Sequence, residues 1–143
     1  MCGIFGLVKN ENSNISDIDT FELVNKLFIF SQTRGSEAAG IAINTGKSID
    51  IYKKAGSPRE FIKSLEYKNL FNNSIKNYIE NQKNSISTNS LSIIGHSRLV
   101  TNGYQSENRN NQPVSIPGCV GIHNGIITNH SQLWNVNKNL QQE

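Results

Sequence analysis

Cysteine, long apolar runs and grouped charges are all scarce in this sequence of 143 residues. Its two cysteines, Cys2 and Cys119, are too few for a disulfide framework, which favours a reducing compartment. No apolar run approaches the roughly 18 residues of a membrane span, and Lys9 and its polar successors end the first apolar run too early for a signal peptide. We therefore expect a soluble cytoplasmic protein with no membrane partner.

Basic and acidic residues are mixed along the chain, and the formal net charge is only +3. Basic residues outnumber acidic ones between positions 47 and 83, but without the arginine clusters and interleaved aromatics of a nucleic-acid face. The three histidines, His96, His123 and His130, share neither helical spacing nor a cysteine pair. We therefore predict no nucleic-acid partner, no metal site and no cofactor.

The length fits one domain with a core of its own. Apolar alternation and turn residues predict strands over 2–8, 40–44, 48–54, 90–96 and 119–123, the last resuming at 126–127. Helical spacing and capping residues predict helices over 17–31 and about 58–65, within 67–89, and from about 133. Hairpin-like connections between most strands favour an α+β fold with antiparallel sheets.

Cys2 directly follows the initiator methionine. A small side chain at position 2 permits removal of Met1, which would leave a thiol and a free α-amine on one residue. The α-amine has a reference pKa of about 7.7–8.0, so it can act as the base for the thiol without a separate histidine. In isolation, the same pattern also fits a small buried residue at the start of a strand.

Two polar groups follow predicted strands. Arg98 ends a buried strand, and its planar guanidinium suits a carboxylate of a ligand or of a neighbour such as Glu37. Thr101 and Asn102 stand within reach of the same ligand, although both are also ordinary turn residues. Asn124 and Gly125 fit either a hairpin turn or an oxyanion hole made of a side-chain amide and a backbone N–H.

Five segments in order resemble the glutaminase domain of class II glutamine amidotransferases, the N-terminal nucleophile enzymes. They are Met1–Gly6, Arg34–Gly40, Gly95–Gly103, Ser106–Glu107 and His123–Ile127, and together they cover nearly the whole chain. The details lean towards the glucosamine-6-phosphate synthase (glutamine–fructose-6-phosphate aminotransferase) branch. The phosphoribosyl amidotransferase branch is close behind, because Asn111-Gln112-Pro113 looks as much like its pattern.

The resemblance implies an αββα sandwich of antiparallel sheets and hydrolysis of the side-chain amide of L-glutamine. Cys2 would attack the amide carbon, and Asn124 and Gly125 would hold the oxyanion. Arg98 would bind the α-carboxylate of glutamine, with Thr101 and Asn102 lining that pocket. The ammonia would pass to an acceptor domain or synthase partner, most simply of the amino-sugar type.

This sequence also departs from the family pattern. Leu99 stands where the glucosamine-6-phosphate synthase branch usually has a gating tryptophan, Asn102 replaces a histidine, and Asn111-Gln112 replaces an Ala-His pair. The family's acidic residue for the glutamine ammonium is expected beyond Glu143, so we expect residues 1–143 to be a glutaminase domain incomplete at its C-terminus, without an acceptor domain. Alternatives are an acylase that also uses an N-terminal cysteine and a degenerate amidotransferase domain used for binding or regulation.

Overall fold

A four-stranded antiparallel sheet forms the centre of the computed structural model, which describes residues 1–83, 90–100 and 103–138. Its strands lie in the order β1-β4-β2-β3. Their bounds are β1 (Gly3–Asn10), β2 (Ala38–Asn44), β3 (Ile49–Ala55) and β4 (Ser90–Arg98). A separate antiparallel pair consists of β5 (Val114–Ile116) and β6 (Cys119–Gly121). The predicted α+β class with antiparallel sheets is therefore confirmed.

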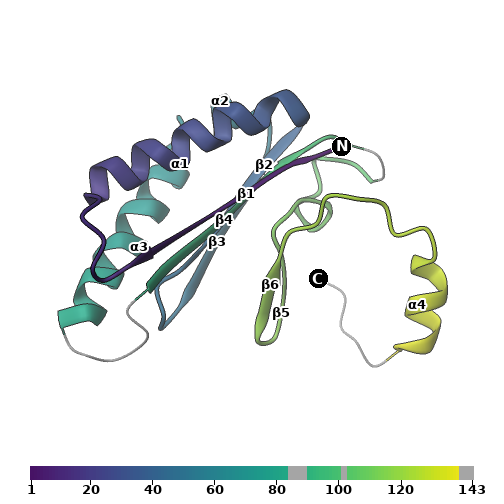
Figure 1. Cartoon of the computed structure of the whole chain (residues 1–143). Helices are drawn as coiled ribbons and strands as arrows, with labels where there is room; N and C mark the ends of the chain where they lie inside the picture. Colours follow the sequence, from purple (N-terminus) through teal and green to yellow (C-terminus); the bar gives the residue numbers. More distant parts are fainter. Residues whose placement is uncertain (84–89, 101–102, 139–143) are drawn as a thin grey trace.

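The helices are distributed around these sheets. They are α1 (Asp17–Ser31), α2 (Pro58–Phe61), α3 (Leu65–Lys83) and α4 (His130–Val136), with short 3-10 helices η1 (Gln32–Arg34) and η2 (Asn108–Asn110). In Figure 1, α1, α2 and α3 lie on one side of the four-stranded sheet, and the β5–β6 hairpin lies on the other, with α4 farther out. Helix α4 buries none of its side chains, so it adds little to the core.

The core lies between the four-stranded sheet and its three covering helices. Because side chains alternate along a strand, every second residue of β2 and β4 points to the helices. The buried cluster combines Ile41, Ile43, Leu91 and Ile93 from the sheet with Val24, Phe28, Phe61, Tyr67 and Phe71 from the helices. Phe5 of β1 joins this layer through an edge-on contact with Phe28. The alternation leaves the other face of the sheet for the polar residues of the site.

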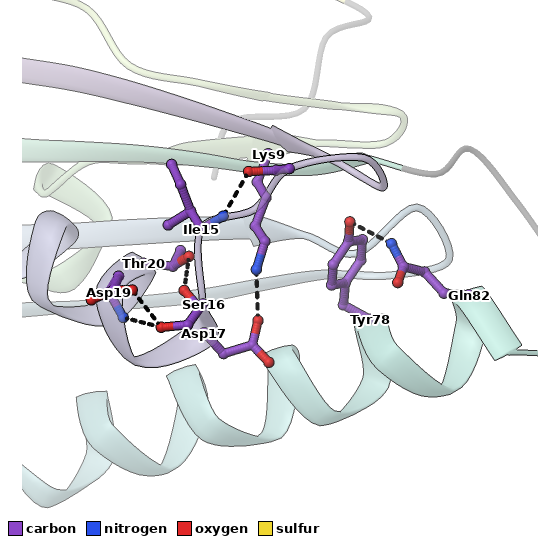
Figure 2. A network of polar contacts seen from close by, with 9 residues as sticks. Lys9, Ile15, Ser16, Asp17, Asp19, Thr20, Tyr78 and Gln82 are labelled. Carbon is purple, nitrogen blue, oxygen red and sulfur yellow. Dashed lines mark hydrogen bonds and ion pairs between the residues drawn. The ribbon is translucent and has the colours of Figure 1, made fainter.

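The start of α1 is fixed as its sequence predicts. The side chain of Ser16 accepts a hydrogen bond from the backbone N–H of Asp19 at 3.0 Å, which caps the helix. Lys9 of β1 forms an ion pair with Asp17 at 2.7 Å, which ties the strand to the first turn of the helix (Figure 2). The predicted bounds of 17–31 are confirmed.

Several predicted bounds are wrong. The helix expected at 58–65 ends at Phe61, although its capping box between Ser57 and Glu60 is present, because the chain turns before α3 begins at Leu65. The strand expected at 119–123 ends at Gly121, and residues 126–127 form no strand because they have no paired neighbour in the described part of the chain. Of the predicted segment 67–89, residues 84–89 lie outside the described residues.

Candidate active site

Cys2 lies directly before β1, at the end of the sheet where β4 finishes. The backbone N–H of Leu99 donates a hydrogen bond to its Sγ at 3.4 Å, and the Sγ lies 3.6 Å from the carbonyl oxygen of Leu99. Cys2 is a partly exposed free thiol. Met1 is 71% exposed, so little packing opposes its removal. The first residues of the chain thus place a thiol beside the peptide that follows β4.

Close packing behind Cys2 fixes the start of β1. A Cβ on Gly3 would lie 2.6 Å from the carbonyl oxygen of Ser31, at the end of α1, so only glycine fits at this position. The hydroxyls of Ser31 and Ser97 are hydrogen-bonded at 2.5 Å in the buried layer below. Gly3 pairs with Ser97 across the β1–β4 ladder. The helix and β4 therefore both define the position of Cys2.

Arg98 is the last residue of β4 and lies at the same end of the sheet as Cys2. Gly3 pairs with Ser97 at the end of the β1–β4 ladder, and Cys2 and Arg98 are the residues directly beyond that pair in the two segments. Ser97 contacts α1, and its neighbour Arg98 therefore points to the face away from the helices. The thiol and the guanidinium thus lie at the same end of the sheet.

Arg98 is 7% exposed, and its guanidinium bonds to the loop that follows β4. Its Nη1 donates to Oδ1 of Asn111 at 2.8 Å, and its Nη2 donates to the carbonyl oxygen of Gly103 at 3.3 Å. Asn111 is fully buried and donates in turn to the carbonyl oxygen of Gln105 at 2.8 Å. In this structure Arg98 therefore organises the loop, and a ligand carboxylate would have to share the guanidinium or displace Asn111.

The segment Arg34–Gly40 holds the backbone around Arg98 and Leu99. A Cβ on Gly35 would lie 2.4 Å from the carbonyl carbon of Arg98, so these two backbone segments touch without a side chain between them. The backbone N–H of Glu37 donates to the carbonyl oxygen of Arg98 at 3.1 Å, and the carboxylate of Glu37 accepts from the backbone N–H of Val100. This segment therefore fixes the peptide that contacts the thiol.

Residues 111–113 cross the outer face of the sheet at Gly40. A Cβ on Gly40 would lie 2.0 Å from the carbonyl oxygen of Gln112, so β2 needs glycine here for the loop to approach. Nζ of Lys53 donates to the carbonyl oxygens of Asn111 at 3.0 Å and Pro113 at 3.1 Å. Lys53 pairs with Gly40 in the β2–β3 ladder. Two paired residues of the sheet, Gly40 of β2 and Lys53 of β3, thus hold residues 111–113 in place.

The segment Asn124–Gly125 follows β6 and is connected to this loop by hydrogen bonds at the preceding residue, His123. The side chain of Gln112 forms two hydrogen bonds with the backbone of His123, the residue before Asn124. Oδ1 of Asn124 is buried, and no described residue provides it with a hydrogen-bond donor. A Cβ on Gly125 would lie 2.8 Å from the imidazole of His123. The hydrogen bonds of the residue before Asn124 thus lead to Gln112, whose neighbour Asn111 is bonded by Arg98.

A hollow of about 420 Å³ lies at the N-terminus. Met1, Leu99 and residues 32–36 line it. Its volume falls within the range of about 300–1,000 Å³ that is usual for small-molecule sites. Because Met1 forms part of its wall, loss of Met1 would enlarge the hollow on the side of Cys2.

His96 lies two residues before Arg98 on the same face and is 1% exposed. Both ring nitrogens are buried without a hydrogen-bond partner among the described residues. Burial, and then the nearby charge of Arg98, lower the pKa of His96 to about 4, so the ring is neutral at pH 7. In the described ranges, no three His, Cys, Asp or Glu residues are grouped as a metal site.

Two predicted site residues, Thr101 and Asn102, lie outside the described residues. The remaining four fall into two groups: Cys2 with Arg98, and Asn124 with Gly125. Sequence reasoning did not foresee the role of Gln112 or Asn111 as the link between them. The only available signal was the proline after them, which marks a fixed backbone but not a partner.

No protein-family profile matches the chain. The chain is 33% identical over 137 residues, 93% of its length, to an amidophosphoribosyltransferase of Methanocaldococcus jannaschii. It is 26% identical over 137 residues, again 93% of its length, to a glutamine–fructose-6-phosphate aminotransferase (isomerizing) of Shouchella clausii. Both names belong to the family that the sequence motifs resemble. Over 93% of its length the chain is similar to class II glutamine amidotransferases.

The match covers only part of each relative: 24% of the amidophosphoribosyltransferase and 18% of the aminotransferase. Of these two relatives, the chain has the higher identity to the amidophosphoribosyltransferase. The predicted lean towards the glucosamine-6-phosphate synthase branch therefore gains no support from these identities, and the branch stays a prediction. None of the described helices is long and apolar enough to cross a membrane.

Proposed function

We propose that this chain hydrolyses the side-chain amide of glutamine, with Cys2 as the nucleophile. The observation that carries the proposal is the hydrogen bond from the Leu99 N–H to the Cys2 thiol, at the end of the sheet where β4 finishes with Arg98. An exposed, easily removed Met1 and a hollow beside it are consistent with a processed N-terminus that receives a small substrate. Similarity to two glutamine amidotransferases over 93% of the chain supports the same reaction class.

In the proposed reaction, removal of Met1 frees the α-amine of Cys2. The neutral amine takes the thiol proton, and Sγ attacks the amide carbon of glutamine. The side-chain amide of Asn124 and the backbone N–H of Gly125 stabilise the oxyanion of the tetrahedral intermediate. The α-amine then protonates the leaving nitrogen, ammonia departs and a thioester remains. Water attacks the thioester, which releases glutamate and regenerates the thiol.

Arg98 binds the α-carboxylate of glutamine in this scheme, and Thr101 and Asn102 complete the pocket. A carboxylate can replace the neutral Oδ1 of Asn111 on the guanidinium, because it carries the opposite charge and can accept two parallel hydrogen bonds. The ammonia passes to an acceptor domain or partner. An amino-sugar synthase is the acceptor favoured by the motifs, and a phosphoribosyl acceptor is the one favoured by the higher identity.

A glutaminase assay with Cys2→Ala tests the proposal, and Cys119→Ala is the matched control. Cys119 is the other free cysteine and lies exposed in β6. Loss of the nucleophile should lower glutamate release by about 10³-fold or more, whereas the control should stay within about twofold of wild type. Unchanged turnover in Cys2→Ala would contradict the proposal. A wild-type protein that binds glutamine without releasing glutamate would favour the alternative of a degenerate domain used for binding or regulation.

A further inference from the structure

The side chain of Gln112 forms a two-point contact with the backbone of His123. Its Nε2 donates to the carbonyl oxygen of His123 at 3.1 Å, and its Oε1 accepts from the backbone N–H of His123 at 2.5 Å. A primary amide can satisfy one peptide residue in this way because it carries a donor and an acceptor side by side. The contact lies two residues beyond the end of β6 at Gly121.

The backbone of Gln112 and of its two neighbours is held against the central sheet. The carbonyl oxygen of Gln112 lies against Gly40 of the central sheet, where no Cβ would fit. Its neighbour Asn111 is fully buried and bonded by Arg98, and Lys53 binds the carbonyl oxygens of Asn111 and Pro113. Gln112 therefore projects from a segment attached to the sheet that carries Arg98.

The residues that Gln112 holds are those next to the proposed oxyanion donors. His123 directly precedes Asn124, and the imidazole of His123 packs against Gly125. The backbone of His123 thus determines where the Asn124 amide and the Gly125 N–H can lie. Helix α4 buries no side chain, and the hairpin residues Val114 and Ile116 are exposed, so little packing is available to fix this segment.

We propose that Gln112 is the positioning residue for the oxyanion hole: it holds His123 so that Asn124 and Gly125 face the amide attacked by Cys2. This inference rests on the proposed function. It differs from a contact to substrate, because Gln112 acts through the backbone of His123. Displacement of catalytic groups by about 1 Å can lower a rate by roughly 10²-fold, so the effect should fall on the chemical step.

Two substitutions in the full natural protein separate the parts of the contact. Gln112→Ala removes both hydrogen bonds, and Gln112→Glu keeps the acceptor for the His123 N–H but loses the donor to its carbonyl. Gln105→Ala is the control, because Gln105 is exposed and contributes its backbone carbonyl to the loop. Three quantities are measured: kcat and KM for glutamine, hydrogen exchange of the His123 amide, and the rate at which iodoacetamide alkylates Cys2.

Gln112→Ala should lower kcat by about 10–10²-fold with KM within about threefold, and Gln112→Glu should lie between it and wild type. Exchange of the His123 amide should accelerate in Gln112→Ala, and alkylation of Cys2 should not change, because no oxyanion forms in that reaction. The control should match wild type. A kcat unchanged in Gln112→Ala would overturn the inference, as would a loss expressed only in KM or a parallel loss of Cys2 alkylation.

Other outcomes are also decisive. If Gln112→Ala does not fold, the test uses Gln112→Glu. In that variant, faster hydrogen exchange of the His123 amide with an unchanged kcat would overturn the inference. If the wild-type protein releases no glutamate, the proposed function fails, and the positioning role fails with it. If the wild-type protein is active and substitution of Gln112 leaves kcat unchanged, only the positioning role is overturned.

Discussion

The backbone N–H of Leu99 donates a hydrogen bond to the Sγ of Cys2 at 3.4 Å, across 97 residues of sequence. This contact joins the first residues of the chain to the peptide that follows β4. Gly35 and Glu37 hold the same peptide from the other side, through close backbone packing and two hydrogen bonds. Three of the five segments that carry the family resemblance, Met1–Gly6, Arg34–Gly40 and Gly95–Gly103, therefore meet at the backbone beside the proposed nucleophile.

Replacement of Gly3 by alanine should displace Cys2. The new Cβ would lie 2.6 Å from the Ser31 carbonyl oxygen and 2.7 Å from the Ser31 Cβ, and both the strand and the helix end are buried there. Overpacking of this kind costs about 1–3 kcal/mol of unfolding free energy. We expect a loss of that size in denaturant unfolding, together with lower glutaminase activity. Gly121→Ala is the control, because nothing lies within 4 Å of its Cβ; equal effects in both variants would contradict the packing argument.

Replacement of Arg98 by lysine should raise the KM for glutamine by about 10–10³-fold, because lysine cannot form the two parallel hydrogen bonds of a guanidinium with a carboxylate. Steady-state kinetics would measure this effect. The matched control is Arg109→Lys, since Arg109 is paired with Glu107 on the surface. If KM stays constant while kcat falls, Arg98 serves only to organise the loop through Asn111 and Gly103.

Replacement of Asn124 by alanine should lower kcat by about 10²–10³-fold with a small effect on KM, which is the usual result of removing one oxyanion donor. The comparison variant is Asn129→Ala, at the exposed residue before α4, where the side chain makes no capping hydrogen bond. A wild-type kcat in Asn124→Ala would remove this residue from the proposed mechanism.

The depressed pKa of His96 predicts a pH dependence of stability. Between pH 6.5 and about 4 the unfolded chain binds a proton at His96 that the folded chain refuses, so this residue lowers stability as the pH falls through that window. The loss at pH 5 relative to pH 7 should be about 2 kcal/mol. His96→Asn should reduce the pH 7-to-5 difference in unfolding free energy by that amount, and His130→Asn, at an exposed residue, should not. Equal differences in all three proteins would contradict this assignment.

Local patterns predicted the elements well where the determining contacts are local. Ser16 and Asp19 cap α1, and the predicted helix 17–31 has the observed bounds. Sequence reasoning failed where partners decide: Ile126 and Ile127 favour a strand by composition, but they have no paired neighbour among the described residues.

The candidate site was predicted only in part, for the same reason. The motifs indicated Cys2 and Arg98, and both residues lie directly beyond the terminal Gly3–Ser97 pair of β1 and β4. The bonds from Arg98 to Asn111 and from Gln112 to His123 join residues 11 to 13 positions apart through loops. No hydrophobic period encodes such contacts, because they depend on where the loop crosses the sheet.

The most direct test of the central claim is the site at which an electrophilic glutamine analogue, such as diazo-oxo-norleucine, reacts with the full natural protein. Peptide mass spectrometry should find the adduct on Cys2 at a methionine-free N-terminus, and excess glutamine should protect against labelling. An adduct on Cys119, or a retained Met1 in active protein, would contradict the account.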